Sequence, residues 1–255
     1  MTITLYGSWF SPFARKVALA LELKGLAYDH VDALTREFHA ELVRLNPRAE
    51  VPVLVDEGTS VVNSSDILQY LDWRYPERSL YPADLGERVA ARALERLADH
   101  RLDPIVVNCS FWHWAERTDQ PPEGLRDKGQ LAFEGVLAQL EQALIPRPKP
   151  WPFGAPGVVE CALYANLLAA PALGFSLDEA RFGHVVAFLR AMRAHPLFAA
   201  DAQRAGRFLK TLQHSSHERR RLFWSGDRLE WLLANGFHDW LTGEIEAGRA
   251  TFPQG

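Results

Sequence analysis

Residues 51–71 read VPVLVDEGTSVVNSSDILQYL and carry the signals for two strands and the start of a helix. The apolar, β-branched run over 51–55 favours a strand, and the Glu-Gly dipeptide that follows favours a hairpin turn into a second strand over 59–62. Ser64 or Ser65 is then expected to cap a helix that runs to about residue 75. This stretch therefore predicts a β-hairpin followed by a helix.

The residues before this stretch extend the same small sheet. TITLY at residues 2–6 is typical of a strand, and Ser11-Pro12 resembles a helix N-cap followed by proline at the first helical position. A second strand is expected over 27–31 and a second helix over about 36–45. The resulting order β-α-β-α-β-β-α is too mixed for a doubly wound parallel sheet and indicates a small α/β sheet flanked by helices.

The rest of the chain predicts helices alone. A long helical pattern over 86–117 is interrupted by Asp103-Pro104, where a kink is expected, and a proline-rich loop precedes an apolar helix over 157–169. We therefore expect two domains and an extension: an α/β domain over 1–80, a helical domain over 86–200 and a helical C-terminal extension over 201–255.

Composition limits the class of protein. Of 255 residues, 47% are hydrophobic and 24% charged, which excludes a disordered or fibrous chain. The formal net charge of −4 argues against a nucleic-acid binder. Two cysteines cannot form a disulfide framework or a multi-cysteine metal site, and no apolar run or signal peptide suggests a membrane or secretion. We therefore expect a cytoplasmic protein that binds no nucleic acid and no membrane.

Four segments, taken in order, resemble the cytosolic glutathione transferase family. They are Ser11-Pro12-Phe13, Asn46-Pro47 followed by Val51-Pro52-Val53-Leu54, the run from Asn63 to Leu71, and Cys161-Ala162-Leu163-Tyr164. The resemblance covers about residues 2–200. It implies a thioredoxin-like N-terminal domain followed by an all-helical C-terminal domain. It also implies glutathione as co-substrate, no metal, and a homodimer with the helical halves in the interface.

Ser11 is the candidate catalytic residue. As a helix N-cap it contributes about 1 kcal/mol. In the same position, its hydroxyl and the positive end of the helix can stabilise a thiolate. The resemblance to serine-type classes implies this second role, and Ser8 is the alternative.

Four residues are expected to bind glutathione. The resemblance implies that Val51 precedes a cis proline and pairs its backbone with the tripeptide, and that Ser64 receives the γ-glutamyl carboxylate at a helix start. Asn63 stands where relatives commonly have an acidic residue or glutamine. Glu50 stands where many have glutamine or lysine, so its charge would repel the glycine carboxylate unless it is turned away. Arg48 is one candidate to supply the missing positive charge, and Arg36 is the other.

Aromatic residues are the candidates for a second-substrate pocket. Phe10, Phe13 and Trp112 are expected to line it between the two halves, although aromatic residues also serve as core. In the extension, the apolar spacing of Leu229, Leu232, Leu233, Phe237 and Leu241 predicts one buried helical face that bends at Gly236.

The leading hypothesis is a glutathione transferase whose activated thiol attacks a small hydrophobic electrophile. A non-catalytic ligand-binding or interaction protein of the same fold is the alternative from another class, and Asn63 and Glu50 favour it. A glutathione-dependent etherase, dehalogenase or isomerase would use the same activated thiol, and the sequence does not separate these reactions.

Overall fold

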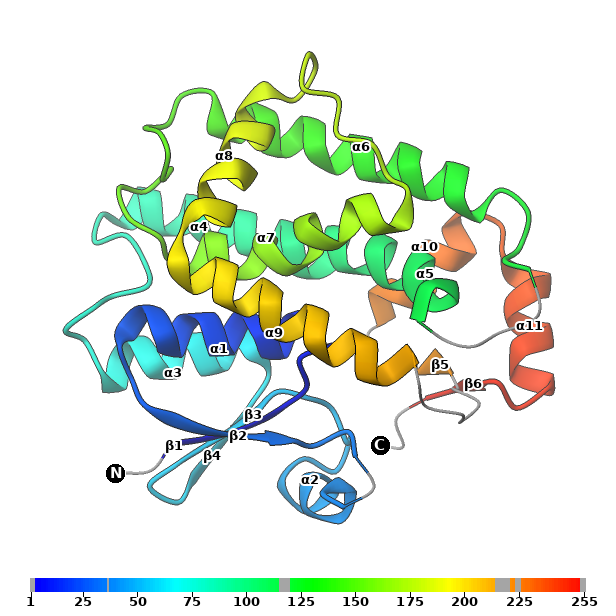
Figure 1. Cartoon of the computed structure of the whole chain (residues 1–255), viewed down its shortest axis with the longest axis horizontal. Helices are drawn as coiled ribbons and strands as arrows, with labels where there is room; N and C mark the ends of the chain where they lie inside the picture. Colours follow the sequence, from blue (N-terminus) through cyan, green and yellow to red (C-terminus); the bar gives the residue numbers. More distant parts are fainter. Residues whose placement is uncertain (1–2, 36, 115–119, 214–220, 223–225, 253–255) are drawn as a thin grey trace.

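The computed structural model describes residues 3–35, 37–114, 120–213, 221–222 and 226–252 (Figure 1). The first seven elements are β1 Ile3–Gly7, α1 Pro12–Lys24, β2 Tyr28–Asp32, α2 His39–Leu45, β3 Val53–Asp56, β4 Thr59–Val62 and α3 Ser64–Arg74. The next are α4 Leu85–Leu97, the π-helical turn η1 Ala98–Leu102, α5 Asp103–Trp114, α6 Leu125–Leu144, α7 Val158–Ala169 and the 3₁₀ turn η2 Ala170–Leu173. The last are α8 Gly183–Ala194, α9 Pro196–Gln213, β5 Arg221–Leu222, α10 Gly226–Ala234, α11 His238–Glu246 and β6 Ala250–Thr251.

The N-terminal half forms one four-stranded sheet in the order β2-β1-β3-β4. β1 pairs with β2 in parallel and with β3 antiparallel, and β3 pairs with β4 antiparallel through the expected hairpin. Figure 1 shows α1 and α3 between this sheet and the helical half, with α2 on the other side. The predicted order β-α-β-α-β-β-α and the thioredoxin-like fold are confirmed.

Helix α1 has Ser11 as its N-cap and Gly25 as its C-cap, as the sequence predicts. The Ser11 hydroxyl oxygen accepts a hydrogen bond from the Ala14 N–H at 3.3 Å, and Pro12 occupies the first helical position. Gly25 ends the helix in the left-handed conformation, at φ 73°, where a side chain would add strain. Between these ends, Val17, Leu19 and Leu21 are fully buried, so α1 lies in the core of the protein.

A π-helical turn lies directly before Asp103-Pro104, where the sequence predicts a kink. The long helix is divided into α4, η1 and α5, and Asp103 begins α5. Pro104 cannot donate the helical hydrogen bond to the preceding turn, and its ring crowds the carbonyl there, so the ladder widens before it. Around this turn, Asp99 contacts Lys16 of α1 and Asp103 contacts Arg228 of α10.

Helix α7 runs through the middle of the helical half. Cys161, Leu163 and Tyr164 are fully buried. The Glu160 carboxylate accepts a hydrogen bond from the Gly157 N–H at 2.7 Å. A Cβ at Gly157 would lie 2.4 Å from the Leu80 carbonyl oxygen, so only glycine fits at this start of the helix.

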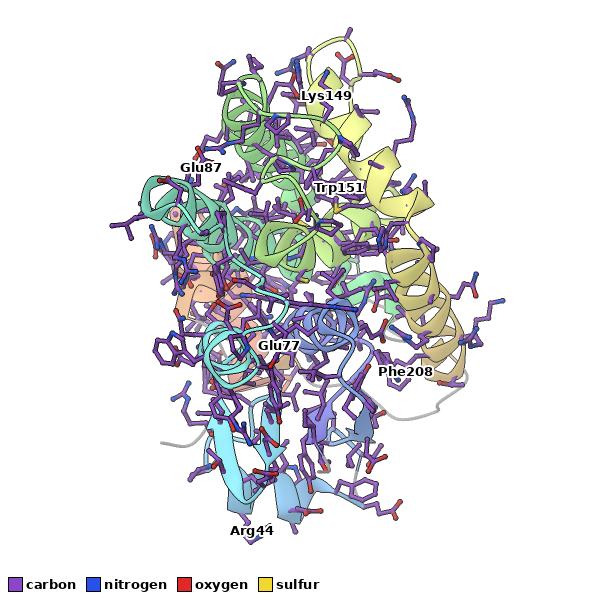
Figure 2. All side chains as sticks on the ribbon, turned by 90° about the vertical axis from the view of Figure 1, so that its left-hand side faces the viewer. Arg44, Glu77, Glu87, Lys149, Trp151 and Phe208 are labelled. Carbon is purple, nitrogen blue, oxygen red and sulfur yellow. The ribbon has the colours of Figure 1, made fainter. Side chains whose placement is uncertain are left out.

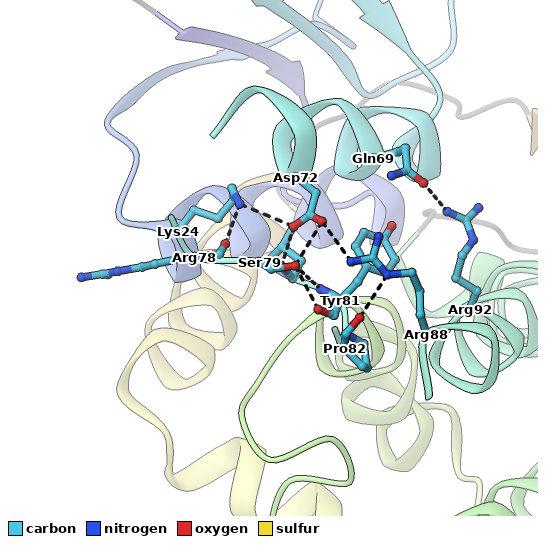
Figure 3. A network of polar contacts seen from close by, with 10 residues as sticks. Lys24, Gln69, Asp72, Arg78, Ser79, Tyr81, Pro82, Arg88 and Arg92 are labelled. Carbon is cyan, nitrogen blue, oxygen red and sulfur yellow. Dashed lines mark hydrogen bonds and ion pairs between the residues drawn. The ribbon is translucent and has the colours of Figure 1, made fainter. Parts of the chain in front are cut away.

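The segment that joins the two halves is held by a polar network (Figure 3). The Asp72 carboxylate of α3 accepts hydrogen bonds from the Leu80 N–H at 2.8 Å and the Ser79 hydroxyl at 3.1 Å. Lys24 of α1 donates to the Arg78 carbonyl at 2.5 Å. These contacts connect the linker to both helices of the N-terminal half that face the helical half.

Two ion pairs set the position of α9 against α1. Arg15 donates from two nitrogens to the Asp201 carboxylate, at 3.0 and 2.5 Å, and both side chains are buried. One turn further along α9, Arg204 lies 2.6 Å from Glu22. On α1 the cation precedes the anion, and on α9 the anion precedes the cation. A shift of one helix by one turn along the other would therefore break both pairs.

The C-terminal extension docks on the helical half. Helix α10 packs beside α5, α11 lies at the right of Figure 1, and Leu232, Phe237 and Leu241 are buried as expected. Leu233 is 43% exposed, which corrects the expectation that it shares the buried face. Between α10 and α11 the chain bends at Gly236, at φ 80°.

Two expectations about the extension need correction. The boundary placed between residues 200 and 201 falls inside α9, which is one continuous helix that packs on α1 and α8. The extension is also not purely helical, since β5 and β6 pair in parallel. Two-residue strands leave no periodicity to detect in sequence.

The far end of the molecule is formed by the proline-rich loop. Figure 2 shows Lys149 of this loop at the end opposite to Arg44 of α2. The Trp151 ring contacts His195 edge-on at 5.8 Å between centroids, and Arg147 lies 4.2 Å from the Phe153 ring. The first contact holds the loop against the end of α8, and the second lies within the loop itself.

A buried ion pair joins the extension to α5. Arg228 donates to both Asp103 oxygens, at 2.9 and 3.1 Å, and both side chains are buried. We predict that Arg228→Met lowers the free energy of unfolding by about 3–5 kcal/mol, because Asp103 would remain buried without its counter-charge. Urea denaturation measures this change. Arg190→Met, at a pair with Glu179 in which both side chains are more than 60% exposed, should change it by about 0.5 kcal/mol or less. Equal effects of the two substitutions would contradict this account.

Glu160 makes the stability depend on pH. Burial raises the pKa of Glu160 from 4.5 to about 7, against the opposing effect of the Gly157 N–H. Below pH 4.5 the carboxyl is protonated in the folded and unfolded states. As pH rises from 4.5 to 7, the unfolded state loses this proton first, so the free energy of unfolding falls.

We predict that Glu160→Gln removes about 2–3 kcal/mol of this loss between pH 5 and pH 8. Urea denaturation of both proteins at each pH gives the comparison, in which all other titrating groups cancel. The same pH dependence in both proteins would show that Glu160 titrates normally.

Candidate active site

The turn between β1 and α1 brings Ser8 and Ser11 together. The Ser11 N–H donates to the Ser8 carbonyl at 2.9 Å. Ser11 is half-buried, and its hydroxyl lies at the positive end of α1, whose first turn contains no acidic residue. An anion beside Ser11 would meet a hydroxyl donor and a favourable dipole, without an opposing carboxylate on this helix turn.

Ser8 is used to hold the turn itself. It is 1% exposed, and its hydroxyl oxygen accepts a hydrogen bond from the Phe10 N–H at 3.4 Å. Its hydroxyl donates to the Asp32 carboxylate, although burial still raises the pKa of Asp32. Of the two serines, Ser11 alone is accessible to a ligand.

Trp9 and its neighbours form a polar and aromatic cluster beside this turn that sequence reasoning missed. The Trp9 ring stacks on His30 with centroids 4.1 Å apart, and the Arg204 guanidinium lies 4.8 Å from the Trp9 ring. Burial and the Arg204 charge lower the pKa of His30 to about 4, so its ring is neutral at pH 7. No local pattern signals this cluster, because its members come from the loop after β1, from β2 and from α9.

The loop before β3 contains the expected cis peptide bond between Val51 and Pro52. The Asn46 side-chain amide donates to the Glu50 carbonyl at 3.1 Å and holds this loop. The Glu50 carboxylate is paired with Arg48 at 2.8 Å, so its charge is locally compensated. Arg36, the other expected source of positive charge, lies outside the described residues.

The start of α3 differs from the expectation that Ser64 or Ser65 caps the helix. Asn63 is the N-cap, and its side-chain oxygen accepts a hydrogen bond from the Ser65 N–H at 3.0 Å. Its φ of 72° is left-handed, a conformation that asparagine tolerates better than most residues. Ser64 is therefore the first helical residue and is 5% exposed.

Behind this helix start lies a buried ionic cluster. The Lys16 ammonium lies 2.7 Å from Glu95, 2.7 Å from Asp99 and 3.0 Å from the Ser65 hydroxyl. Lys16 and Glu95 are each 1% exposed, and burial raises the pKa of Asp99 despite the ammonium. The cluster connects α1, α3, α4 and η1. The one sequence signal for it is a lysine within an apolar helical run.

The aromatic candidates lie on three elements. Phe10 and Phe13 are half-buried on either side of Ser11-Pro12, and Arg228 lies 6.0 Å from the Phe13 ring. On α5, Trp112 is half-buried and contacts Trp240 of α11 at 5.7 Å between centroids.

Two small cavities lie away from Ser11. One of about 80 Å³ is lined by the proline-rich loop and α8, and one of about 70 Å³ lies at the start of α7. Each has room for a few water molecules at most. Within the described ranges, no group of three or more His, Cys, Asp or Glu side chains could hold a metal ion. In the same part of the chain, no helix is both long and apolar enough to span a bilayer.

The chain is similar in sequence to proteins of known families. Residues 5–79 match the family described as "Glutathione S-transferase, N-terminal domain". The chain is 33% identical over 205 residues to a maleylacetoacetate isomerase of Pseudomonas aeruginosa, a match that covers 76% of this chain and 92% of that protein. It is 34% identical over 110 residues to glutathione S-transferase U6 of Arabidopsis thaliana. That match covers 43% of this chain and spans about half (48%) of the plant protein's length.

Among solved structures, the chain is similar to the maleylacetoacetate isomerase of Anaeromyxobacter dehalogenans, which has GSH bound in its active site. The TM-score is 0.62 and the identity 32%, and the match covers 78% of this chain and 94% of the other. A Tau class glutathione S-transferase from mango superposes with a TM-score of 0.68, at 20% identity, over 82% of this chain and 98% of the other, which shows the fold alone.

The Asn63 cap gives a test of the helix start. We predict that Asn63→Ala lowers the free energy of unfolding by about 1–2 kcal/mol, because alanine loses the cap and is strained at positive φ. Asn63→Gly should cost only a few tenths of a kcal/mol, since glycine accepts this conformation and is itself a tolerated cap. Chemical denaturation of the two variants measures the difference, and a glycine variant as unstable as the alanine variant would refute it.

Proposed function

The chain belongs to the cytosolic glutathione transferase family, and from this premise we propose that it uses Ser11 to activate the thiol of glutathione. The observation that carries the proposal is the half-buried Ser11 hydroxyl at the N-terminus of α1, next to a fully buried Ser8. The Ser11 hydroxyl donates a hydrogen bond to the thiolate, and the helix dipole adds to its stabilisation.

The energy required is within reach of these groups. A free thiol of pKa about 8.5 is mostly neutral at pH 7, and lowering that pKa by about two units takes roughly 2.7 kcal/mol. A hydrogen bond to a charged group contributes about 1.5–3 kcal/mol, and a helix terminus about 0.3–1 kcal/mol. Ser11 and α1 together therefore contribute about 1.8–4 kcal/mol, a range that includes the required free energy.

Glutathione is proposed to lie across the start of α3 and the loop before β3. The Val51 backbone pairs with the extended tripeptide, and the buried N-terminus of α3 at Ser64 receives the γ-glutamyl carboxylate. Asn63 acts through its cap, because its side-chain oxygen is already bonded to the Ser65 N–H. Glu50 is compatible with an anionic tripeptide because Arg48 compensates its charge.

The proposed reaction is conjugation with a small hydrophobic electrophile. With a chloro-nitroaromatic compound, the thiolate sulfur forms a bond to the ring carbon that carries chlorine, the carbon–chlorine bond breaks, and chloride leaves. The thiol proton passes to solvent. The protein forms no covalent bond and Ser11 remains unchanged. Phe10, Phe13 and Trp112 are proposed to contact the electrophile.

Glutathione-dependent isomerisation is the second candidate. Its support is that relatives named maleylacetoacetate isomerase match over most of their length, 92% for the Pseudomonas aeruginosa protein and 96% for a probable isomerase of Vibrio cholerae. In that reaction the same thiolate would add to a carbon–carbon double bond and leave again after rotation. Assays with a chloro-nitroaromatic compound and with maleylacetoacetate distinguish the two candidates.

We predict that Ser11→Ala raises the pKa of bound glutathione by about one unit or more and lowers turnover about tenfold or more at pH 7. The pKa is read from thiolate absorbance against pH, and turnover from conjugation of a chloro-nitroaromatic compound. The pH–rate curve should shift upward, so the variant recovers activity as pH rises above the raised pKa. Unchanged activity and thiol pKa in Ser11→Ala would exclude the proposed role, whatever the result for Ser8→Ala.

A homodimer is proposed from an exposed apolar face on α3 and α4. Trp73, Leu85 and Val89 are 73%, 75% and 60% exposed. The adjacent contact between Gln69 and Arg92, at 3.0 Å, joins the two helices that carry them. Large apolar side chains grouped on one surface are costly to leave in water, and a second copy of this chain is proposed to cover them.

We predict that the wild-type protein elutes with twice the 28.8 kDa chain mass and that Trp73→Glu shifts it to the mass of one chain. The introduced carboxylate would have to be desolvated in the interface, which is unfavourable. Leu131→Glu, at an equally exposed position on α6, is the control and should remain dimeric. Light scattering that finds a monomeric wild type at micromolar concentration would refute the dimer.

A further inference from the structure

We propose that Trp9 is a positioning residue for Ser11. Its indole, held by His30 of β2 and Arg204 of α9, fixes the turn between β1 and α1 so that the Ser11 hydroxyl points at the thiolate. The inference rests on the proposed function, because it concerns the hydroxyl that stabilises the thiolate. The cluster of Trp9, His30 and Arg204 has no part in the chemical step itself and acts through Ser11 alone.

The backbone of the turn is closed by hydrogen bonds among its own residues. The Ser11 N–H donates to the Ser8 carbonyl at 2.9 Å, and the Phe10 N–H donates to the Ser8 hydroxyl oxygen at 3.4 Å. The Ser8 hydroxyl also donates to Asp32, which ties the start of the turn to β2. The middle of the turn lies between these bonds, at Trp9 and Phe10, and the direction of the Ser11 hydroxyl depends on how it is held.

Trp9 connects the middle of the turn to two other elements. Its ring stacks on His30 of β2, with centroids 4.1 Å apart and the planes at 15°, and the Arg204 guanidinium of α9 lies 4.8 Å from the same ring. Ring stacking and a cation near the ring restrict both the position and the tilt of the indole. A tryptophan side chain has only two χ angles, so restricting its ring also restricts the backbone of the turn.

Arg204 is held in place by α1 and is compatible in charge with His30. The guanidinium lies 2.6 Å from the Glu22 carboxylate, and the same carboxylate oxygen accepts a hydrogen bond from the Tyr28 hydroxyl at 3.1 Å. Burial and the Arg204 charge lower the pKa of His30 to about 4. The imidazole is therefore neutral at pH 7 and does not repel the guanidinium, so both contacts of Trp9 exist together.

The His30 ring is packed at the start of α1. A Cβ at Gly7 would lie 3.4 Å from His30 Nε2 and 2.9 Å from the Ala14 Cβ, so the end of β1, the His30 ring and the first turn of α1 leave little space between them. Ala14 is the residue whose N–H donates to the Ser11 hydroxyl oxygen. The ring that stacks on Trp9 is therefore packed beside the helix turn that Ser11 caps.

The position of Trp9 matters because the hydrogen bond from Ser11 to the thiolate is directional. Such bonds weaken steeply as the angle at the hydrogen falls, and a functional group has to be held within about 0.5 Å and about 10–20° of its working position. Without the indole, the turn keeps its local bonds but loses its attachment to α9. The Ser11 hydroxyl then meets the sulfur with poorer geometry, and the thiol is harder to ionise.

The first test measures the pKa of bound glutathione from thiolate absorbance in the absence of an electrophile, so that no contact between Trp9 and a second substrate contributes. Trp9→Leu should raise this pKa by about half a unit or more. Trp9→Phe keeps a ring against His30 and should raise it by about half as much or less. An unchanged pKa in Trp9→Leu would overturn the inference and leave the proposed function standing.

Turnover gives an independent reading of the same change. At a pH below the wild-type thiol pKa, Trp9→Leu should lower kcat about threefold or more, because the fraction of thiolate falls by that factor. The KM for glutathione should stay within about twofold, since glutathione binds there as the neutral thiol in both proteins. A raised KM with an unchanged kcat would show that Trp9 serves binding alone, which would overturn the inference.

The second test repeats Trp9→Leu in the Ser11→Ala background. Because Trp9 is proposed to act through Ser11, the pKa of bound glutathione should rise there by about 0.2 units or less. A shift as large as in the presence of Ser11 would show that Trp9 acts on the thiolate directly, and would overturn the inference. If Ser11→Ala alone leaves the pKa unchanged, the proposed function fails and the inference falls with it.

The third test removes the anchor on α9, and it also decides the question if Trp9→Leu does not fold. Arg204→Met should raise the pKa of bound glutathione by about 0.4 units or more when Ser11 is present, and by about 0.2 units or less in Ser11→Ala. Arg207→Met removes the same charge from an exposed position one turn further along α9. As the matched control, it should leave the pKa within about 0.2 units.

Two results with Arg204→Met would overturn the inference. No shift would mean that α9 does not hold the turn, and equal shifts with and without Ser11 would mean that the Arg204 charge acts on the thiolate directly. The absorbance midpoint comes from glutathione-bound protein only, so a partial loss of folded protein lowers the signal without moving the pKa.

Discussion

The Lys16 ammonium group lies almost fully buried in α1, between Glu95 of α4 and Asp99 of η1. A charge in this environment is tolerated only where opposite charges and hydrogen bonds surround it. Its contact with the Ser65 hydroxyl adds α3 to the group. The three helices therefore have few alternative arrangements, and the helix starts that form the candidate site are held relative to one another.

A second set of charges performs the same task on the other side of α1. Arg15 and Glu22 of α1 face Asp201 and Arg204 of α9, in opposite order. The hydrophobic effect is non-directional, so apolar contacts alone do not fix how far α1 is shifted along α9. The two ion pairs form only at one relative position of these helices. Apolar side chains of α1 are buried in the core, and its ion pairs with α9 fix the position of the helix along its axis. Ser11 therefore lies at the start of a helix that contacts both halves of the protein.

Much of the fold follows from local sequence signals, and several site details do not. Ser11 with Pro12, the Glu-Gly turn and the break at Asp103 are short-range features, and each was found where the chemistry predicts it. The cap at Asn63 was missed, because its positive φ depends on how β4 meets α3. The burial of Lys16 was missed because its partners lie about eighty residues away in sequence. The roles of Ser11 and the glutathione-binding residues remain predictions.

The crystal structure of the protein with bound glutathione tests the central claim most directly, because it locates the sulfur atom relative to the two serines. The account predicts the sulfur within about 3.5 Å of the Ser11 hydroxyl oxygen, with the γ-glutamyl carboxylate at the Ser64 N–H. A sulfur atom held by another side chain, with Ser11 bonded only to the Ala14 N–H, would contradict it.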